Sequence, residues 1–433
     1  MKKIVIIGNG ITGTTVARNI RKLSDYEITI VSSESEHFFS RTALMYIYMG
    51  HMKYEHTKPY EDWFWKKNRI NLIKAEVQKI DFKEKTLLLS ENNSIKYDSL
   101  VIASGSVSNK FGWPGQDLKG VQGLYNLQDV STMETSTKNI KQAVIVGGGL
   151  IGIEMAEMLH SRHIPVIFLV RESKYWNNVL PDQEAEMIGR HIISQGIDLR
   201  LQSELKEIIG DENGVVQSII TGSGEKIACQ FVGLTAGVSP NIKFLKNTDL
   251  ETDRGILVNE FLETNIENVY AAGDCAEFRL PLPDHPKVEQ LWYTGKMQAE
   301  MLARTICGNR SAYQRGIWFN SAKFFDIEYQ TYGIVFNKPR ESEKTFYWEH
   351  ADGQKCFRMI YNSEEEIIGF NFFGIRYKQN VADTFIRTKT NIKDVIDRLS
   401  EGFFDPEFFE SYHKPIKNAF VEFCNSTKIK SIY

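Results

Sequence analysis

Two glycine-rich loops carry the most evident chemistry of the sequence. The first, Gly8-Asn9-Gly10-Ile11-Thr12-Gly13, follows the apolar run at residues 4–7. A GxGxxG loop between a strand and a helix is typical of dinucleotide binding, because its glycines allow a tight turn and close approach of backbone to pyrophosphate. The helix N-terminus then faces the phosphates. We therefore predict nucleotide contacts at this loop, the alternative being a glycine turn without a ligand. The expected contacts are Gly8, Gly10, Ile11, Thr12 and Gly13.

A carboxylate is needed near this loop if the ribose of the nucleotide is to be bound. In such folds an acidic residue at the end of the second strand, about 20 residues after the glycines, accepts hydrogen bonds from the ribose hydroxyls. Residues 28–31 predict that strand, Ser32 and Ser33 follow it, and Glu34 is the nearest carboxylate. We therefore assign the ribose to Glu34, the alternative being a solvated surface glutamate.

The second glycine loop repeats the first. Gly147, Gly149 and Gly152 each lie 139 positions after the corresponding glycine of the first loop, and they too follow an apolar run, at residues 143–146. A dehydrogenase with one nicotinamide cofactor needs one such fold, whereas a flavoprotein that receives hydride from a nicotinamide needs two. The repeat predicts the second kind, with chance duplication and one degenerate site as the alternative. The predicted contacts of the second loop are Gly147, Gly149, Leu150, Ile151 and Gly152.

The residue after the second strand of the repeat bears on which nicotinamide nucleotide is bound. Residues 166–170 predict that strand, and Arg171 follows in place of an acid. A carboxylate there would favour the ribose diol of NAD, whereas an arginine can pair with the 2′-phosphate of NADP. The sequence thus favours NADPH over NADH. Glu172 counts against this preference, and a solvated Arg171 is the alternative.

Hydrophobic periodicity predicts the elements around these loops. Val16, Ile20 and Leu23 lie at helical spacing and predict the buried stripe of the first helix. Residues 70–77 and 86–89 are expected to be strands of a small sheet. Further helices are predicted at residues 182–194, 289–306, 381–399 and 405–424, and further strands at residues 356–361 and 367–373. Residues 231–241 are expected to be another strand that runs into a glycine-containing loop.

Two predicted strands end in small residues that suit a ligand. Residues 97–105 end in Ala103-Ser104-Gly105, and residues 268–272 are followed directly by Gly273 and Asp274. A glycine at a strand end permits close approach of a ligand, and an aspartate can accept a hydrogen bond from a ligand hydroxyl. Both strand ends are therefore candidate parts of the nucleotide site.

Composition narrows the class of protein. The 433 residues suggest about three domains, and 42% hydrophobic with 25% charged residues is ordinary for a globular protein. The net charge is −3 and no block of like charges occurs, which argues against nucleic acid or an anionic membrane as main partner. No apolar stretch approaches the roughly 20 residues of a membrane span.

The cysteines indicate a compartment rather than a site. They are five in number and widely spaced, and they form neither a CxxC motif, a metal-ligand pattern nor a disulfide framework. We therefore expect no metal site, and a reducing cytoplasm as the location.

Together these motifs resemble the FAD- and NAD(P)-dependent pyridine nucleotide disulfide oxidoreductase superfamily, over residues 1 to about 330. The resemblance implies an α/β fold with two Rossmann-like domains of the glutathione-reductase type and an α+β C-terminal interface domain. It implies a discontinuous FAD-binding domain at residues 1–112 and 245–316, an NAD(P)-binding domain at 113–244, and the interface domain at 317–433.

The same resemblance assigns ligands to the motifs. It implies that the first loop holds the ADP half of FAD, that the second holds NADPH or NADH, and that Asp274 positions the ribityl chain of FAD. It implies further cofactor contacts at Arg41, Val77, Ala103, Ser104, Gly105, Gly237, Gly273 and Leu291.

Disulfide reductases of this superfamily carry a redox cysteine in the stretch that corresponds to residues 37–46. Here Arg41 stands at that position, and the first cysteine of the chain is Cys229. Disulfide chemistry through a thiol at that position is therefore excluded. The pattern from Ser40 to Leu44 is similar to the cysteine-free branch, which includes rubredoxin and ferredoxin reductases, the flavoprotein part of nitrite reductase and apoptosis-inducing factor.

Two residues are candidate catalytic groups by this resemblance. Glu154 matches a family glutamate at the edge of nicotinamide and flavin, and Tyr46 stands where several relatives have a lysine that pairs with it. Lys323 matches a lysine near the flavin pyrimidine edge, where a cation would stabilise reduced flavin. The alternatives are a helix-terminal glutamate and a surface lysine on a strand.

The sequence thus predicts an FAD-dependent NAD(P)H oxidoreductase that passes electrons to an acceptor without a redox-active disulfide. The acceptor is expected to be a small redox protein or a quinone-like molecule, and a homodimer is possible. An NAD(P)H oxidase that reduces dioxygen is one alternative. A flavin-based redox sensor that responds to NAD(P) by changing its interactions is another.

Overall fold

The computed structural model of the chain describes residues 1–281, 285–405 and 407–427, and it forms two compact units. The first unit comprises Met1–Ile140, Gly210–Gln217 and Gln230–Arg315. The second comprises Lys141–Ile209, Ser218–Cys229 and the described chain from Gly316 onward. This division does not test the predicted domain boundaries, which stay a prediction.

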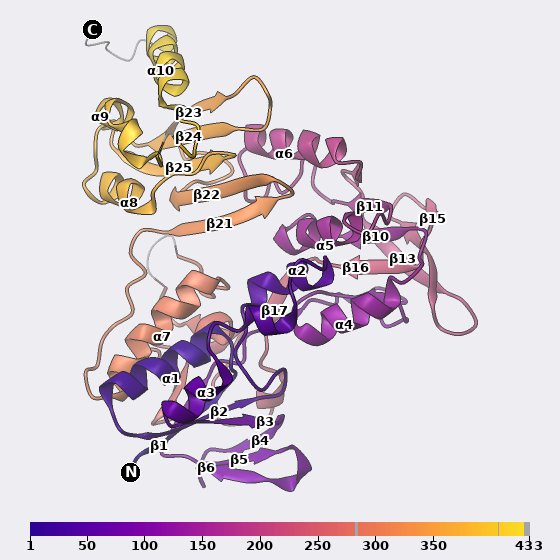
Figure 1. The fold of residues 1–433 in the computed structure, drawn as a ribbon, viewed down its shortest axis with the longest axis vertical. Helices are drawn as coiled ribbons and strands as arrows, with labels where there is room; N and C mark the ends of the chain where they lie inside the picture. Colours follow the sequence, from indigo (N-terminus) through magenta and orange to yellow (C-terminus); the bar gives the residue numbers. More distant parts are fainter. Residues whose placement is uncertain (282–284, 406, 428–433) are drawn as a thin grey trace. The chain divides into compact units, whose positions relative to one another are not determined.

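A five-stranded parallel sheet forms the centre of the first unit (Figure 1). Its middle strand carries an unbroken apolar run, as expected of a parallel strand covered on both faces, and four of the five residues of that strand are buried. The strand order is β19 (Val269–Ala271), β7 (Ser99–Ile102), β1 (Lys3–Ile7), β2 (Glu27–Ser32) and β3 (Ile70–Lys74).

The prediction that residues 70–77 belong to a small sheet is wrong for most of that stretch. β3 pairs in parallel with β2, with Ser32 opposite Lys74, and so extends the main sheet. The small sheet starts only at Val77 and consists of β4 (Val77–Asp81), β5 (Thr86–Leu89) and β6 (Ser94–Lys96). A short apolar run does not reveal which strand it will pair with, since pairing depends on partners distant in the sequence.

Two long helices pack together in the first unit: α1 (Ile11–Leu23) and α7 (Trp292–Ile306) lie side by side (Figure 1). Val16 and Ile20 are buried as predicted, but Leu23 is 55% exposed because it is the last residue of α1, where the chain turns toward β2. The helix predicted from residue 289 begins at Trp292, because Leu291 has an extended backbone and acts as the N-cap.

Shorter elements complete the first unit. β8 pairs antiparallel with β17, β9 pairs in parallel with β16, and β18 pairs in parallel with β20. These elements are α2 (Leu44–Tyr48), α3 (Asp62–Lys67), α4 (Leu127–Ser136), β8 (Ser106–Ser108), β9 (Val121–Gln122), β16 (Phe231–Leu234), β17 (Val238–Pro240), β18 (Ile256–Val258) and β20 (Ala276–Phe278).

The second unit contains the repeated strand, loop, helix and strand. β10 (Ala143–Val146) pairs in parallel with β11 (Val166–Leu169), and β11 pairs in parallel with β12 (Asp198–Arg200). The helix that follows the second glycine loop is α5, and the predicted helix at residues 182–194 is confirmed as α6. The bounds are α5 (Leu150–His160), α6 (Asp182–Ser194) and β15 (Lys226–Ala228). β13 (Leu205–Gly210) and β14 (Val216–Thr221) are divided between the units, because Gly210–Gln217 is part of the first.

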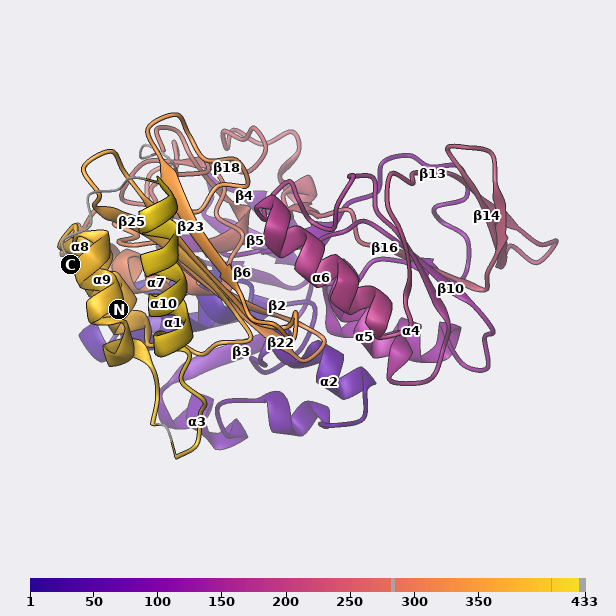
Figure 2. The ribbon, with the colours of Figure 1, turned by 90° about the horizontal axis from the view of Figure 1, so that it is seen from above.

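An antiparallel sheet forms the C-terminal part of the second unit. Its strand order is β21 (Phe319–Phe324), β22 (Ile327–Gly333), β25 (Ile367–Phe373), β24 (Cys356–Tyr361) and β23 (Lys344–Glu349). The last helix, α10 (His413–Thr427), lies beside β23 (Figure 2). Phe372 and Phe403 are buried in the core of this part, whereas Phe408 is 72% exposed.

The predicted C-terminal helices are shorter than expected. The stretch at residues 381–399 contains two helices, α8 (Gln379–Arg387) and α9 (Ile392–Asp397). Asn391 separates them and caps α9, since its side chain accepts a hydrogen bond from the backbone N–H of Lys393. The helix predicted from residue 405 begins only at His413.

No helix within the described residues combines the length and the apolar character that a membrane crossing requires.

Candidate functional site

The first glycine loop is closed by backbone contacts that exclude side chains. Gly8 has a φ of +103°, and a Cβ there would lie 2.1 Å from the carbonyl oxygen of Ala103. A Cβ on Gly13 would lie 2.0 Å from the carbonyl oxygen of Gly8. The strand end, the loop and α1 are therefore interlocked through two positions that tolerate only glycine.

Gly10 differs from these two glycines because it faces open space. Its backbone is extended, and apart from Gly10 and its chain neighbours no described atom lies within 4 Å of the place where a Cβ would stand. Among the described residues, no side chain caps the N-terminus of α1, and its first turn holds no acidic residue. The free N–H groups and the positive end of the helix dipole thus fit a phosphate group.

Asn9 fixes the loop to the end of β2. Its buried Nδ2 donates to the carbonyl oxygen of Ser35 at 2.7 Å, and its Oδ1 accepts a hydrogen bond from Ser32 Oγ at 2.9 Å. The GxGxxG pattern does not reveal this role, because Asn9 occupies one of its variable positions. Its side chain therefore ties the first glycine loop to the segment at the carboxyl end of β2.

Glu34, the predicted ribose ligand, is held by three N–H donors. Arg41 donates to Oε1 at 3.0 Å and to Oε2 at 2.5 Å, and the backbone N–H of Leu127 donates to Oε1 at 2.9 Å. An ionised carboxylate offers about four acceptor positions, so capacity remains for one ribose hydroxyl. The ribose assignment stays a prediction. The pairing with Arg41, itself a predicted cofactor contact, was not visible in the sequence.

The Gly273-Asp274 turn lies against the first glycine loop. Gly273 has a φ of +77°, and a Cβ there would lie 2.5 Å from Thr12 Oγ1. Asp274 Oδ2 accepts a hydrogen bond from Ser106 Oγ at 3.0 Å and from the Tyr125 hydroxyl at 3.3 Å. Removal from water raises the pKa of Asp274 above its ordinary value. Two motifs far apart in the sequence are thus brought to one place.

The other predicted contacts of the first unit lie at strand ends, in loops and at the N-cap of α7. Ala103 meets Gly8, Ser104 Oγ donates to the carbonyl oxygen of Asn241 at 2.8 Å, and Gly105 has a φ of +72°. The remaining predicted contacts in this unit are Val77, the first residue of β4; Gly237, with a φ of +83°; and Leu291, the N-cap of α7.

Cys275 directly follows Asp274 in the chain. The thiol is buried and donates to the carbonyl oxygen of Ile102 at 3.3 Å. Burial raises its pKa, so it stays a protonated, weakly nucleophilic thiol.

The second glycine loop shares with the first a glycine at positive φ, an open glycine and an uncapped helix N-terminus. Gly147 has a φ of +115°, and Gly149 is extended with no described atom within 4 Å of its Cβ position. Leu150, Ile151 and Gly152 form the first turn of α5. Within the described residues, no side chain caps this helix N-terminus, and its first turn holds no acidic residue. The second loop therefore also fits a nucleotide phosphate.

The two candidate catalytic residues, Glu154 and Lys323, meet around α5. Lys323 on β21 forms an ion pair with Glu157 of α5 at 2.6 Å from Nζ to Oε1. Burial and then the charge of Glu157 raise the pKa of Glu154 to about 7, while Lys323 acts in the opposite direction. Glu157 was missed in the sequence, although it lies on the same helix three residues after Glu154. The cluster provides a carboxyl group that changes charge near neutral pH.

Glu154→Gln is expected to remove a pH dependence of stability. A folded-state pKa of about 7 lies above the ordinary value of an unfolded glutamate, so folded protein binds the extra proton. Stability should therefore fall as pH rises from about 4.5 to about 7, by up to about 3 kcal/mol, and stay low above that range. Urea unfolding of wild type and Glu154→Gln at about pH 5 and about pH 8 measures this.

The exposed Glu364 in the turn between β24 and β25 offers a matched control for that comparison. Glu364→Gln should leave the pH dependence of the wild type unchanged. If Glu154→Gln and wild type lost the same stability between the two pH values, the elevated pKa of Glu154 would be refuted.

Arg171, the predicted contact of the 2′-phosphate, lies beyond the carboxyl end of β11. Its side chain is 73% exposed, and Nη2 lies 3.1 Å from Glu172 Oε1. Exposed ion pairs of this kind contribute little, with a median of about 0–1 kcal/mol. The guanidinium can therefore leave Glu172 for a stronger anion.

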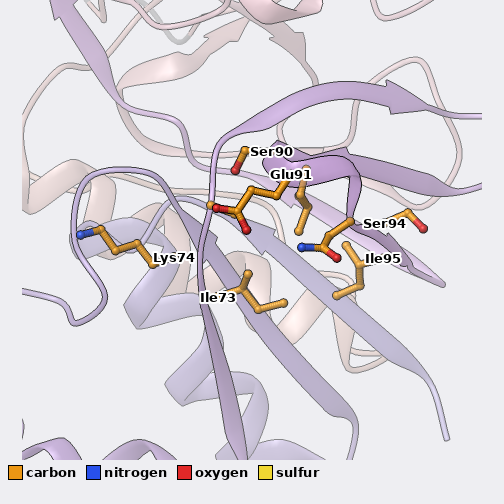
Figure 3. A pocket seen from close by; sticks show the side chains of 9 residues that line it. Ile73, Lys74, Ser90, Glu91, Ser94 and Ile95 are labelled. Carbon is orange, nitrogen blue, oxygen red and sulfur yellow. The ribbon is translucent and has the colours of Figure 1, made fainter.

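A surface cavity of about 280 Å³ lies elsewhere in the first unit, where β3 ends beside the turn between β5 and β6 (Figure 3). Its lining includes Ile73 and Lys74 from β3 and Ser90 and Glu91 from the turn. Its lining includes none of the predicted cofactor contacts.

Residues 2–299 match the family described as pyridine nucleotide-disulphide oxidoreductase. The chain belongs to this family. The predicted family, the α/β fold class and the prediction of an oxidoreductase are thereby confirmed. FAD and a nicotinamide nucleotide are the cofactors typical of the family.

Individual relatives are distant. The chain is 27% identical over 398 residues to a nitrite reductase [NAD(P)H] of Bacillus subtilis, covering 91% of this chain and 48% of that protein. It is 29% identical over 341 residues to an NADH-rubredoxin oxidoreductase of Clostridium acetobutylicum. That match covers 78% of this chain and 83% of that protein. The chain is also similar to the solved structure of an NAD-dependent persulfide reductase from A. fulgidus, with a TM-score of 0.84 and 21% identity. That match covers 98% of this chain and 84% of the solved one. The chain spans about half the length of the first curated relatives it matches.

Proposed function

We propose that the protein is an FAD-dependent NAD(P)H oxidoreductase that passes electrons to an electron-carrier protein or a small acceptor without a redox-active disulfide. The observation that carries this proposal is the pair of glycine loops, each of which leaves an uncapped helix N-terminus beside an open glycine. Bound FAD would supply two-electron uptake from the nicotinamide and release to the acceptor. The names of the nitrite reductase and the rubredoxin oxidoreductase above agree with this class of reaction.

Residues of this chain would bind the two cofactors, orient them and set the charge around Glu154. Gly10 and Gly149 would leave room for the two pyrophosphates at the N-termini of α1 and α5. Asp274 would accept a hydrogen bond from the ribityl chain, and its anchoring by Ser106 keeps that acceptor in place. Lys323 would bring a positive charge, partly balanced by Glu157, to the cluster that contains Glu154. Cytoplasmic location and homodimer formation stay predictions.

The purified protein provides the direct test. It should be yellow or take up added FAD, its flavin absorbance should bleach under anaerobic NADPH or NADH, and a carrier such as rubredoxin should reoxidise it faster than dioxygen. A colourless protein that takes up no FAD would refute the proposal. Fast reoxidation by dioxygen alone would instead support an NAD(P)H oxidase.

Arg171→Glu is expected to reverse the preference for NADPH. Loss of a charge-assisted hydrogen bond to the 2′-phosphate should lower kcat/KM for NADPH relative to NADH by at least about tenfold. The measurement is kcat/KM with both nucleotides at several salt concentrations. Arg398→Glu, on an exposed pair with Glu401 in the same unit, is the control. An unchanged ratio in Arg171→Glu would show that this arginine does not select the nucleotide.

A further inference from the structure

Tyr125 joins two groups of the flavin site that no sequence motif connects. Its hydroxyl accepts a hydrogen bond from the backbone N–H of Ser106 at 2.8 Å and lies 3.3 Å from Asp274 Oδ2. Its carbonyl oxygen accepts from Arg41 Nη1, whose guanidinium carbon lies 4.5 Å from the centroid of the Tyr125 ring. One residue thus contacts both the cation beside Glu34 and the carboxylate that follows Gly273.

The surroundings of the Tyr125 hydroxyl favour one hydrogen-bond direction. The backbone N–H of Ser106 can only donate, so the tyrosine accepts from it and has its own proton left for Asp274. Removal from water and the nearby carboxylate raise the pKa of Tyr125, so the proton stays on at neutral pH. The groups that face this residue are Arg41, Glu34, Ser106 and Asp274.

The backbone after β7 leaves room for this hydroxyl. A Cβ on Gly105 would lie 2.8 Å from the Tyr125 oxygen, so a larger residue there would displace the ring. Ser106 extends the network, because its Oγ donates to Asp274 and accepts from Gln290 Nε2 at 2.8 Å. The Asp274 carboxylate is therefore fixed by two hydroxyl donors, both of which have further hydrogen-bond partners.

The backbone of the same turn is held from another side. The N–H of Gly273 donates to Gln298 Oε1 at 2.7 Å, and Gln298 Nε2 donates to the buried Glu289 at 3.2 Å. Glu289 in turn pairs with Arg315 at 3.1 Å. Because this second network fixes the peptide of Gly273, loss of the Tyr125 hydroxyl should change the Asp274 side chain and leave the turn intact.

We propose that Tyr125 is a positioning residue of the flavin site, which fixes the Asp274 carboxylate and the Arg41 guanidinium before FAD binds. The inference rests on the proposed function, since it gives Asp274 the ribityl chain as its ligand. Preorganisation of this kind lowers the ordering cost of binding. The tyrosine would therefore contribute to FAD affinity without necessarily contacting the reacting atoms.

The test uses the full chain with its flavin removed and compares four proteins with the wild type. Tyr125→Phe deletes the hydroxyl and keeps the ring under Arg41. Tyr97→Phe is a matched control, because the buried Tyr97 hydroxyl has no hydrogen-bond partner among the described residues. Asp274→Asn and the double variant Tyr125→Phe/Asp274→Asn complete a double-mutant cycle. The readouts are the FAD dissociation constant from flavin fluorescence and the visible circular dichroism of bound flavin.

We expect Tyr125→Phe to raise the FAD dissociation constant about tenfold, the effect of losing one hydrogen bond to a charged group. Tyr97→Phe should stay within about twofold of wild type. The double variant should bind FAD as Asp274→Asn does, because a residue that acts through Asp274 adds nothing once that carboxylate is gone. The visible circular dichroism should change in Tyr125→Phe and stay unchanged in Tyr97→Phe.

Three outcomes would overturn the inference. Equal FAD affinity and circular dichroism in Tyr125→Phe and wild type would refute the positioning role while leaving the proposed function intact. Additive losses in the double variant would show that Tyr125 acts independently of Asp274. Failure of the wild type itself to bind FAD would refute both the proposed function and this inference.

Discussion

Replacing Gly13 by alanine is expected to abolish FAD binding and to lower the free energy of unfolding by about 3 kcal/mol. The new methyl group would lie 2.0 Å from the carbonyl oxygen of Gly8 and 3.1 Å from Ile6 Cγ2. Gly8 is itself held in place, because its N–H donates to the carbonyl oxygen of Val31 at 2.8 Å. The helix would therefore have to move away from the loop that is expected to hold the pyrophosphate.

Comparison with Gly10→Ala distinguishes an effect on the stability of the fold from an effect on FAD binding. Gly10 has an ordinary φ of −67° and open space at its Cβ position, so its replacement should change stability by no more than about 1 kcal/mol. The methyl group would occupy the space expected for the pyrophosphate, and FAD affinity should fall at least about tenfold. Urea unfolding and FAD titration of both variants measure the two effects. Wild-type FAD affinity in Gly10→Ala would show that this loop does not hold the pyrophosphate.

The second large effect is expected from the buried ion pair of the second unit. Arg358 on β24 donates from Nε and Nη2 to the carboxylate of Glu184 on α6 at 2.6 and 2.7 Å, and both side chains are almost fully buried. Thr345 and Gln183 accept further hydrogen bonds from the guanidinium. Removing one partner leaves the other charge buried without compensation, which costs about 3–5 kcal/mol.

Arg358→Met should therefore lower the free energy of unfolding of the second unit by about that amount. Replacing both residues by apolar ones, as in Arg358→Met/Glu184→Leu, should recover most of the loss, because a well-packed apolar pair often replaces a buried ion pair at little cost. Arg387→Gln, on an exposed pair with Asp383 in α8, is the control and should cost no more than about 0.5 kcal/mol. Equal losses in the single and double variants would contradict this account.

The sequence predicted the parts of the fold that depend on local pattern. β1, α1 and the second glycine loop lie where apolar runs and glycines placed them, because three glycines in fixed spacing impose one turn geometry. Pairing with distant segments was not predictable in the same way. β3 was assigned to the wrong sheet because its partner is 42 positions away, as in the pairing of Ile28 with Ile70.

The side-chain partners within the candidate site were also only partly predictable from the sequence. The sequence identified Glu34 and Asp274 as carboxylates for a ligand, and both lie in the polar network of the first unit. It did not reveal that Arg41 and Leu127 hold Glu34, or that Tyr125 lies between Arg41 and Asp274. These partners come from segments without a recognisable pattern, so only the tertiary fold brings them into reach.

The ion pair of Arg358 with Glu184 also bears on the order in which the two units can fold during synthesis of the chain. The two residues are separated by 174 positions, and the intervening sequence includes the closing segment of the first unit, which ends at Arg315. Since domains generally fold as they leave the ribosome, the first unit can close while the C-terminal sheet is still unmade. α6, which carries Glu184, cannot form its buried ion pair until Arg358 has been synthesised. A chain cut after Arg315 would lack that cation altogether, and its second nucleotide fold should fail to mature even though its glycine loop is complete.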